Sequence, residues 1–208
     1  AERDLAEPLA LLPARYNLAP GQTAGVLIKP KAEIELATLQ WGLLPFWAKE
    51  PGLASHTINA RLDTVDSKPS FRAAFKARHA VVPMAGYYEW QATAQGKQPY
   101  YFQPERGVDS LWAVALWEPR HALQTDASSG TFTLITQPAE GLPASIHNRM
   151  PILLEERDVD KWLSLKPGPS LPFLLTRTLP ALKVYPVAKR VNAARDDDAG
   201  LIEALPMA

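Results

Sequence analysis

The chain has 208 residues, and its 22 lysines and arginines are balanced by 22 aspartates and glutamates, so its formal net charge is zero. This balance excludes a globally basic surface of the kind that non-specific nucleic-acid binders usually carry, so any such contact has to be local. The absence of cysteine excludes disulfides and cysteine-ligated zinc sites, and no apolar run approaches the ~18 residues of a membrane span. We therefore expect a cytoplasmic protein without a membrane segment.

Short strands dominate the predicted secondary structure. The 20 prolines are nearly twice the usual share of about 5%. Proline interrupts helices and central strands, so the elements should be short. β-Branched and aromatic residues predict strands at positions 26–28, 34–41, 80–84, 87–90, 99–103, 111–117, 131–136, 152–154 and 183–185. Residues 91–97 and 121–130 are expected to form polar hairpin loops.

Two helices are predicted from apolar residues spaced i, i+3, i+4. In the first, positions 71, 74 and 75 follow Asp66 and Ser67 as caps and Pro69 in the first turn. In the second, positions 159, 162 and 163 follow the acidic pair Glu155 and Glu156. No repeat or long linker divides the chain. The pattern predicts a single α+β domain over residues 1–208, β-rich, with a mainly antiparallel, barrel-like sheet and a few flanking helices.

Positive charge is concentrated between residues 61 and 79, where five basic residues stand against two acidic ones, a local balance of +3. The basic residues are Arg61, Lys68, Arg72, Lys76 and Arg78. On composition alone, a solvated helix face is the simpler interpretation. The alternative is a local phosphate-binding surface.

Asn59 and Arg61 are candidate ligand-binding residues. On an extended segment they point to the same face, because successive side chains alternate. An amide and a guanidinium can then act on one ligand, and arginine is suited to bidentate contacts with phosphate. The alternative is a loop cap beside a surface charge.

Three tryptophans are candidates for stacking on unpaired bases, a contact worth about 1–3 kcal/mol per base. They are Trp41, Trp47 and Trp90. Most tryptophans are core residues, and we expect Trp41 to be one. Trp47 lies in a loop predicted at positions 45–52, so we expect it to be exposed and available for stacking.

Glu89 is a candidate acid or base. It stands between Tyr88 and Trp90 at the end of an apolar strand. A carboxyl group among aromatic rings is partly desolvated, which raises its pKa toward values useful for proton transfer. The alternative is a glutamate at the end of a strand that points into water.

His147 is a candidate proton carrier, because an imidazole changes charge near neutral pH. A lone histidine is more often structural. A metal site is not expected, since the four histidines, His56, His79, His121 and His147, show no ligand spacing. A serine hydrolase is also poorly supported, because the sequence has no Gly-x-Ser-x-Gly motif.

Taken together, these motifs resemble the SOS-response-associated peptidase (SRAP) family. The similarity runs in the same order from Arg15 to the C-terminus, and six weak motifs in order are specific. The matching segments are Arg15–Gly21, Gln40–Trp47, Ile58–Arg61, Gly86–Trp90, Ile146–Pro151, and a tail from Val191-Asn192 to Leu201-Ile202-Glu203. The resemblance implies a protein of DNA damage and the SOS response that reacts with abasic sites in single-stranded DNA. Such a protein shields the site as a covalent DNA–protein crosslink, and we expect it to act as a monomer without a cofactor.

The resemblance also implies roles for individual residues. Asn59 is expected to position the aldehyde or a sugar oxygen, Glu89 to move protons at the attacking amine, and His147 to protonate the departing ring oxygen. Arg61 and Arg149 are expected to neutralise flanking phosphates, with Trp47 and Trp90 contacting DNA bases. These side chains should therefore converge on one concave site, with the two arginines at its rim.

The nucleophile that the resemblance implies is a cysteine exposed as the N-terminal residue by autoproteolytic removal of Met, with Glu89 taking part in that step. Its α-amine condenses with the aldehyde of the abasic sugar, and its thiol closes on the imine carbon to give a thiazolidine. This chain begins Ala1-Glu2-Arg3 and has no cysteine. We expect that the native N-terminal segment is missing from it, and the alternative is that the thiol has been lost.

Two other functions stay open. One is a single-stranded DNA-binding module that uses the same groove without chemistry. The other is a peptidase that cleaves other proteins in trans. Covalent trapping of abasic DNA distinguishes the crosslinking function from the first, and cleavage of a separate peptide identifies the second.

Overall fold

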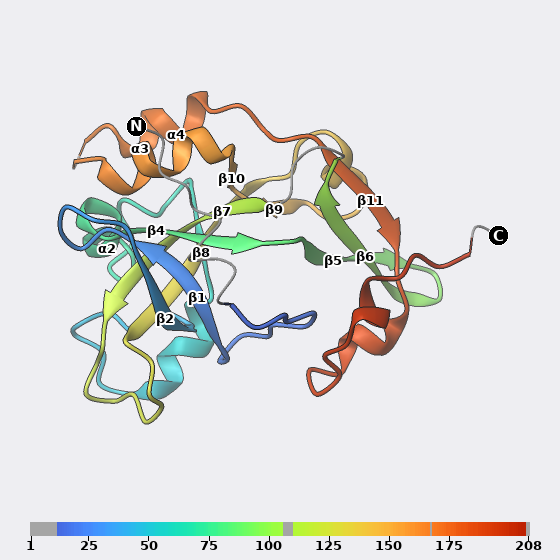
Figure 1. The fold of residues 1–208 in the computed structure, drawn as a ribbon, viewed down its shortest axis with the longest axis horizontal. Helices are drawn as coiled ribbons and strands as arrows, with labels where there is room; N and C mark the ends of the chain where they lie inside the picture. Colours follow the sequence, from blue (N-terminus) through green and yellow to red (C-terminus); the bar gives the residue numbers. More distant parts are fainter. Residues whose placement is uncertain (1–11, 106–109, 167, 207–208) are drawn as a thin grey trace.

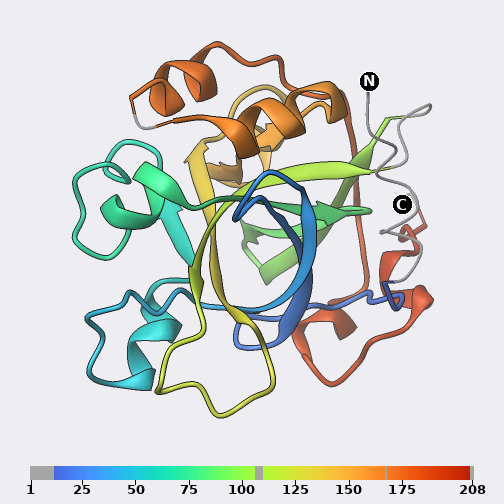
Figure 2. The same ribbon diagram turned by 60° about the vertical axis from the view of Figure 1, so that its left-hand side comes forward.

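Five strands close into a barrel in the structure, a computed structural model that describes residues 12–105, 110–166 and 168–206. The ring runs β7-β4-β1-β2-β8 and closes where β8 pairs with β7 (Figures 1 and 2). Only the β2–β8 pair of this ring is parallel. The barrel strands are β1 (Thr23–Ile28), β2 (Glu35–Trp41), β4 (His79–Met84), β7 (Leu111–Pro119) and β8 (Gly130–Pro138).

Three short strands extend the barrel sheet, and three more form a second sheet beside it. The extensions are β3 (Asn59–Arg61), β9 (Arg149–Pro151) and β10 (Leu153–Leu154). The second sheet has the order β11-β6-β5, so β5 is an edge strand within the described residues. Its strands are β5 (Tyr87–Thr93), β6 (Gly96–Pro104) and β11 (Leu182–Pro186), on the right in Figure 1.

Short helices flank the two sheets. The α-helices are α2 (Arg72–Ala77), α3 (Val159–Ser164) and α4 (Ser170–Thr176), and α3 and α4 lie together at the top of Figures 1 and 2. The 3₁₀ helices are η1 (Pro51–His56), η2 (Leu142–Ser145), η3 (Glu156–Asp158), η4 (Lys189–Asn192) and η5 (Ala199–Ile202). None of the helices in the described ranges is long and apolar enough to cross a membrane.

β7 is buried on both faces along most of its length, which explains its nearly continuous apolar run. On β7, alternate residues enter two different apolar clusters. Trp112 and Val114 join the cluster that contains residues of α2, α3 and α4, and Ala113 and Ala115 join the cluster on the opposite face. Period-two alternation therefore holds, but both faces are apolar.

Trp162 joins the helices to the barrel. It is fully buried, and its indole Nε1 donates a hydrogen bond to the Ala80 carbonyl of β4 at 2.9 Å. Its ring lies 4.0 Å from the His79 ring, centroid to centroid. His79 is also buried, and burial lowers the pKa of its imidazole. Trp162 is one of the apolar residues whose spacing predicted α3, and it is also the residue that packs α3 against β4.

The predicted fold class is confirmed: the chain is α+β, with a mainly antiparallel barrel, a second sheet and few helices. The predicted start of the first helix is wrong. The helix begins at Arg72, its N-cap Phe71 makes no side-chain cap bond, and Asp66, Ser67 and Pro69 lie in the turns before it. Residues 91–97 were also wrongly predicted as a loop, because β5 and β6 continue to a tight turn at positions 94–95. α4 was not predicted.

Trp162→Ala should lower the free energy of unfolding by about 3–5 kcal/mol, because it leaves a cavity under α3. Leu175→Ala is the matched control, since Leu175 on α4 is 65% exposed, and it should change stability by less than about 0.5 kcal/mol. Urea denaturation followed by circular dichroism measures both. Equal effects of the two substitutions would contradict the assignment of Trp162 to the core.

Candidate active site

β3 presents Asn59 and Arg61 on one side of the sheet. Both side chains are exposed, whereas Ala60 between them is buried. β3 runs parallel to β8, with Asn59 beside Leu134 and Arg61 beside Thr136. The alternation expected from an extended segment is therefore present, and β8 determines where both polar groups lie.

Arg149 is held against the same end of β8. Its Nη2 donates to the Thr136 carbonyl at 2.7 Å and lies 3.2 Å from Thr136 Oγ1 and 3.6 Å from Asp63 Oδ1. The Thr136 carbonyl also accepts the Leu62 backbone N–H at 2.8 Å. Arg149 is mostly buried, so it holds β3, β8 and β9 together in addition to offering a positive charge.

Glu89 lies on β5, the edge strand of the second sheet. Its neighbour Trp90 is paired with Pro99, which has no N–H and whose carbonyl accepts from Val187 at 3.1 Å. The Trp90 N–H is therefore free to face away from β6, and it donates to the Glu89 carboxylate. Burial raises the pKa of Glu89, opposed by the nearby His147 and by this hydrogen bond.

The glycine that precedes this strand is required by close packing. A Cβ on Gly86 would lie 2.3 Å from the Phe102 carbonyl oxygen and 2.4 Å from the Tyr101 ring. Both are on β6, so a side chain at position 86 would push the two strands apart. Gly86 therefore allows β5 to bring Glu89 into the site.

His147 faces Glu89, with its Nδ1 3.3 Å from Glu89 Oε2. The same nitrogen is 3.0 Å from the Arg149 carbonyl oxygen, while the Arg149 N–H is 3.3 Å away. Two acceptors against one donor favour the tautomer with the proton on Nδ1. Nε2 is then the nitrogen left to exchange a proton with a ligand.

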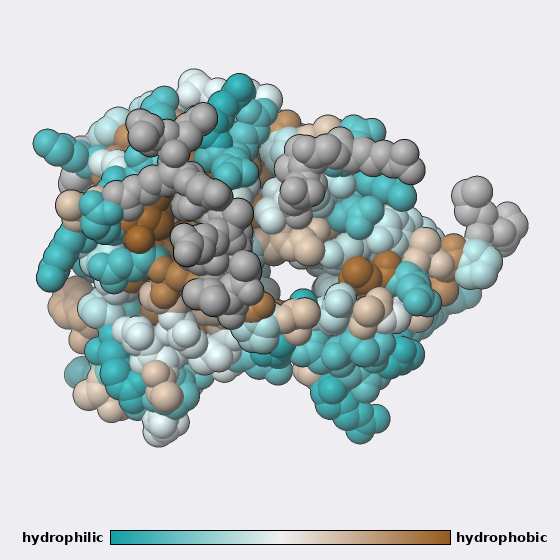
Figure 3. Space-filling model, viewed as in Figure 1, coloured by the Kyte–Doolittle hydropathy of each residue, from teal (hydrophilic) through white to brown (hydrophobic). Residues whose placement is uncertain are grey.

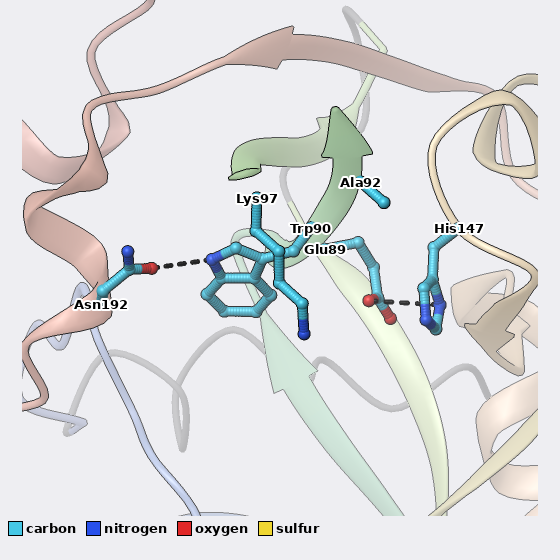
Figure 4. Close-up of a pocket in the computed structure, with 6 residues that line it drawn as sticks. All are labelled: Glu89, Trp90, Ala92, Lys97, His147 and Asn192. Carbon is cyan, nitrogen blue, oxygen red and sulfur yellow. Dashed lines mark hydrogen bonds and ion pairs between the residues drawn. The ribbon is translucent and has the colours of Figure 1, made fainter. Parts of the chain in front are cut away.

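Glu89 and His147 border one cavity of about 480 Å³, and Figure 4 shows their side chains directed toward each other. The lining residues are Glu89, Trp90, Ala92, Lys97, His147 and Asn192. The Trp90 indole Nε1 donates to Asn192 Oδ1 at 2.8 Å, which fixes the ring in the cavity wall. In the space-filling view, the surface is hollowed between the barrel and the second sheet (Figure 3).

The loop that carries His147 is tied to the strand that carries Glu89. Gln91 on β5 donates from Nε2 to the Ser145 carbonyl of η2 at 2.9 Å. The His147 N–H donates to the Pro143 carbonyl at 3.1 Å. These bonds hold the imidazole opposite the carboxylate, although 58 positions separate the two residues in sequence.

The structure brings some of the predicted site residues together and separates others. Glu89, His147 and Trp90 share the cavity. The backbone of Arg61 is paired with Thr136, whose carbonyl accepts from Arg149, and Asn59 lies on β3 and is not among the residues that line the cavity.

Two tryptophans of the Gln40–Trp47 motif have different environments. Trp47 is 42% exposed and lines a separate cavity of about 530 Å³ with Lys49 and His56. Trp41 packs on the core, with its indole Nε1 bonded to the Ile58 carbonyl and its ring stacked on Phe132, as predicted. Trp47 is therefore available for contact with a ligand.

Sequence reasoning gave no role to two polar residues of the cavity, Lys97 and Asn192. Asn192 belongs to the tail that carried part of the resemblance, so its signal was present. Lys97 was placed in a loop and had no signal. The basic stretch is also smaller than its composition implied, because Arg78 is paired with Glu118 at 2.5 Å, a carboxylate that is only 3% exposed.

A family model described as SOS response associated peptidase (SRAP) matches residues 3–194, and the chain belongs to this family.

Curated relatives carry names that describe DNA processing. The chain is 29% identical over 193 residues to "Abasic site processing protein YoaM" of Bacillus subtilis, covering 91% of this chain and 84% of that protein. It is 30% identical to "Abasic site processing protein HMCES" of Gallus gallus, covering 88% and 63%. A crystal structure of a Bacteroides thetaiotaomicron protein has the same fold, with a TM-score of 0.77, 24% identity, and coverage of 98% and 91%.

Glu89→Gln should make stability less sensitive to a rise in pH above the ordinary glutamate pKa. Because burial raises the pKa of Glu89, the folded state prefers the neutral carboxyl, and this contribution is lost as pH rises through the folded pKa. The free energy of unfolding of Glu89→Gln relative to wild type should therefore be constant in acid and increase above the ordinary glutamate pKa. Urea titrations from pH 4 to pH 8 measure the difference. A difference that decreases with pH would mean that attraction to His147 outweighs burial.

Proposed function

We propose that this chain acts as one SRAP-like domain that binds abasic sites in single-stranded DNA and processes them at the Glu89–His147 cavity. The observation that carries the proposal is the carboxylate–imidazole pair, 3.3 Å apart, with the pKa of Glu89 raised by burial. The printed names of the relatives support the substrate class. The cavity of about 480 Å³ has a size suited to a small ligand such as one sugar unit.

The proposed chemistry is imine formation at the open-chain aldehyde of the abasic sugar. Glu89 accepts the proton that an attacking amine releases, since its carboxylate borders the cavity. His147, once protonated on both ring nitrogens, donates from Nε2 to the departing ring oxygen, and Asn59 positions a sugar oxygen. An N-terminal cysteine, exposed by autoproteolytic removal of Met, supplies the amine and closes the imine into a thiazolidine crosslink. The same imine permits strand cleavage as a secondary lyase activity.

The proposed DNA contacts do not depend on base sequence. Arg61 is exposed on β3 and Arg149 offers its charge from β9, so both act on phosphates. Trp90 in the cavity wall and Trp47 on its exposed loop stack on bases. We propose that a single copy of the chain binds DNA in this way, in the cytoplasm and associated with DNA.

Arg61→Ala should weaken binding to single-stranded oligonucleotides of any sequence. It should also reduce the slope of log affinity against log salt by about 0.7, because one phosphate contact is lost. Fluorescence anisotropy at salt concentrations from about 50 to about 300 mM measures both the affinity and its salt slope. An unchanged slope would mean that Arg61 does not contact phosphate.

Arg149→Ala should reduce the salt slope in the same way and also destabilise the fold. It removes charge-assisted bonds to Thr136, which should lower the free energy of unfolding by about 1.5–3 kcal/mol. Arg61→Ala is the matched control, because an exposed arginine should change stability by less than about 0.5 kcal/mol.

The chain that begins at Ala1 should bind abasic single-stranded DNA without forming an adduct that survives denaturation, because no thiol is present to close the imine. A chain extended upstream with Met-Cys-Gly-Arg should form such an adduct on abasic oligonucleotides and not on undamaged ones. Denaturing gel electrophoresis measures the product. Changing the added Cys to Ala should abolish it, and Asn59→Ala should slow its formation with less loss of binding.

Two outcomes would contradict this proposal. An equally stable adduct from the Ala1 chain would assign the chemistry to another group. Cleavage of an unrelated peptide by the extended chain, without any reaction on abasic DNA, would instead support a peptidase that acts in trans.

A further inference from the structure

A lysine borders the same cavity as the carboxylate–imidazole pair. Lys97 lies on β6, where it is paired with Ala92 of β5, and both residues line the cavity with Glu89 and His147. In the view of Figure 4, its side chain passes the Trp90 ring and ends on the side of Glu89. Among the described residues, Lys97 has no ion-pair partner, and its side chain is exposed. A primary amine, a proton acceptor and an imidazole therefore border one small space.

The turn of the β5–β6 hairpin determines where this amine lies. Thr93 is paired with Gly96, so only positions 94 and 95 form the connection. Thr93 Oγ1 donates to the Gly96 carbonyl at 2.6 Å, and Gly96 has a φ of +102°, which favours glycine. Lys97 is thus the second paired residue after the turn, on a rigid hairpin, four pairs along from Tyr88.

We propose that Lys97 is a second amine nucleophile, which forms an imine with the aldehyde of an abasic sugar independently of any N-terminal residue. This inference rests on the proposed function, because that function brings the aldehyde into the cavity. It assigns to Lys97 a lyase activity that releases the DNA after cutting it.

The reaction balances with groups that border the cavity. Lys97 Nζ loses a proton to the Glu89 carboxylate and forms a bond to C1′, and the carbonyl oxygen takes a proton from His147. Glu89 then gives its proton to the hydroxyl group of the carbinolamine, which leaves as water, and a protonated imine remains. Glu89, again a carboxylate, removes a proton from C2′. The C3′–O bond then breaks, and the 3′ phosphate departs with the electron pair. Water adds to the imine carbon and returns the Lys97 amine, so no oxidant or reductant is consumed.

The imine is unstable unless it is reduced, so borohydride trapping is the appropriate test. The chain that begins at Ala1 is incubated with a single-stranded oligonucleotide that carries one abasic site, reduced with sodium borohydride, digested, and mapped by mass spectrometry. The expected result is an adduct on the peptide that contains Lys97. Recovery of the adduct only on the Ala1 α-amine or on other lysines would overturn the proposal, as would the absence of any adduct.

Variants separate a nucleophile from a simple phosphate contact. Lys97→Arg keeps the positive charge and removes the reactive amine, so the trapped adduct and strand cleavage should be lost while binding is retained. Lys183→Arg is the matched control, because Lys183 is an exposed lysine of the same sheet outside the cavity, and it should leave both unchanged. If Lys97→Arg still forms the adduct and only Lys97→Gln weakens binding, Lys97 is a phosphate contact and the proposal fails.

Binding to an oligonucleotide with a tetrahydrofuran abasic analogue, which has no aldehyde, separates this inference from the function on which it rests. Wild-type binding to the analogue without trapping on the natural abasic site would overturn only the role of Lys97. Absence of preferential binding to either abasic oligonucleotide would overturn the proposed function itself.

Discussion

β8 is the constraint on which the rest of the site depends. β2 and β3 pair with it in parallel, and β7 and β9 pair with it antiparallel, so it closes the barrel and also supports the functional strands. At its carboxyl end, the Thr136 carbonyl accepts both the Leu62 N–H and Arg149 Nη2. One half-buried carbonyl thereby joins the strand of Asn59 and Arg61 to the strand that follows His147. A shift of β8 by one residue would turn its own side chains to the opposite face and disrupt its pairing with both strands.

Two opposing effects act on the pKa of the Glu89 carboxyl group. Burial raises the pKa of the carboxyl group, and it is the largest effect. The nearby His147 and the Trp90 N–H both stabilise the charged carboxylate, so they oppose the effect of burial. A carboxyl group balanced in this way can both accept and release a proton, which a fully solvated glutamate does less readily near neutral pH. The edge position of β5 makes the balance possible, because an internal strand would use the Trp90 N–H in its own ladder.

The sequence predicted those parts of the site that depend on short-range periodicity. The shared face of Asn59 and Arg61 follows from alternation on a strand, and the raised pKa of Glu89 follows from its aromatic neighbours. The barrel-like sheet followed from many short β-branched segments, and the meeting of Glu89 with His147 followed from the family resemblance. Lys97 could not be placed, because Ala94 and Gln95 give no signal of a tight turn, and side-chain bonds of Thr93 support it instead. The first helix starts later than predicted because the chain from Leu62 to Phe71 forms successive turns. Candidate cap residues in the sequence do not show that turns precede the helix.

Although the net charge is zero, some of the acidic residues form bonds within the protein. Asp197 near the C-terminus accepts from Arg15 Nε and from the backbone N–H groups of Tyr16 and Asn17, and these bonds lower the pKa of its carboxyl group. The Asn17 amide in turn donates to the carbonyls of three residues of the tail that includes Asn192.

Asn192 holds the Trp90 indole in the cavity wall, so the first and last motifs of the chain act together on the site from a distance. Some of the acidic residues that balance the total charge, such as Asp197, therefore form bonds within the protein. Glu118, which is paired with Arg78, is another. Exposed cations such as Arg61 and Lys97 have no ion-pair partner among the described residues. A neutral chain can thus still present a locally positive surface to a polyanion, because the distribution of charge, and not its sum, determines the local potential.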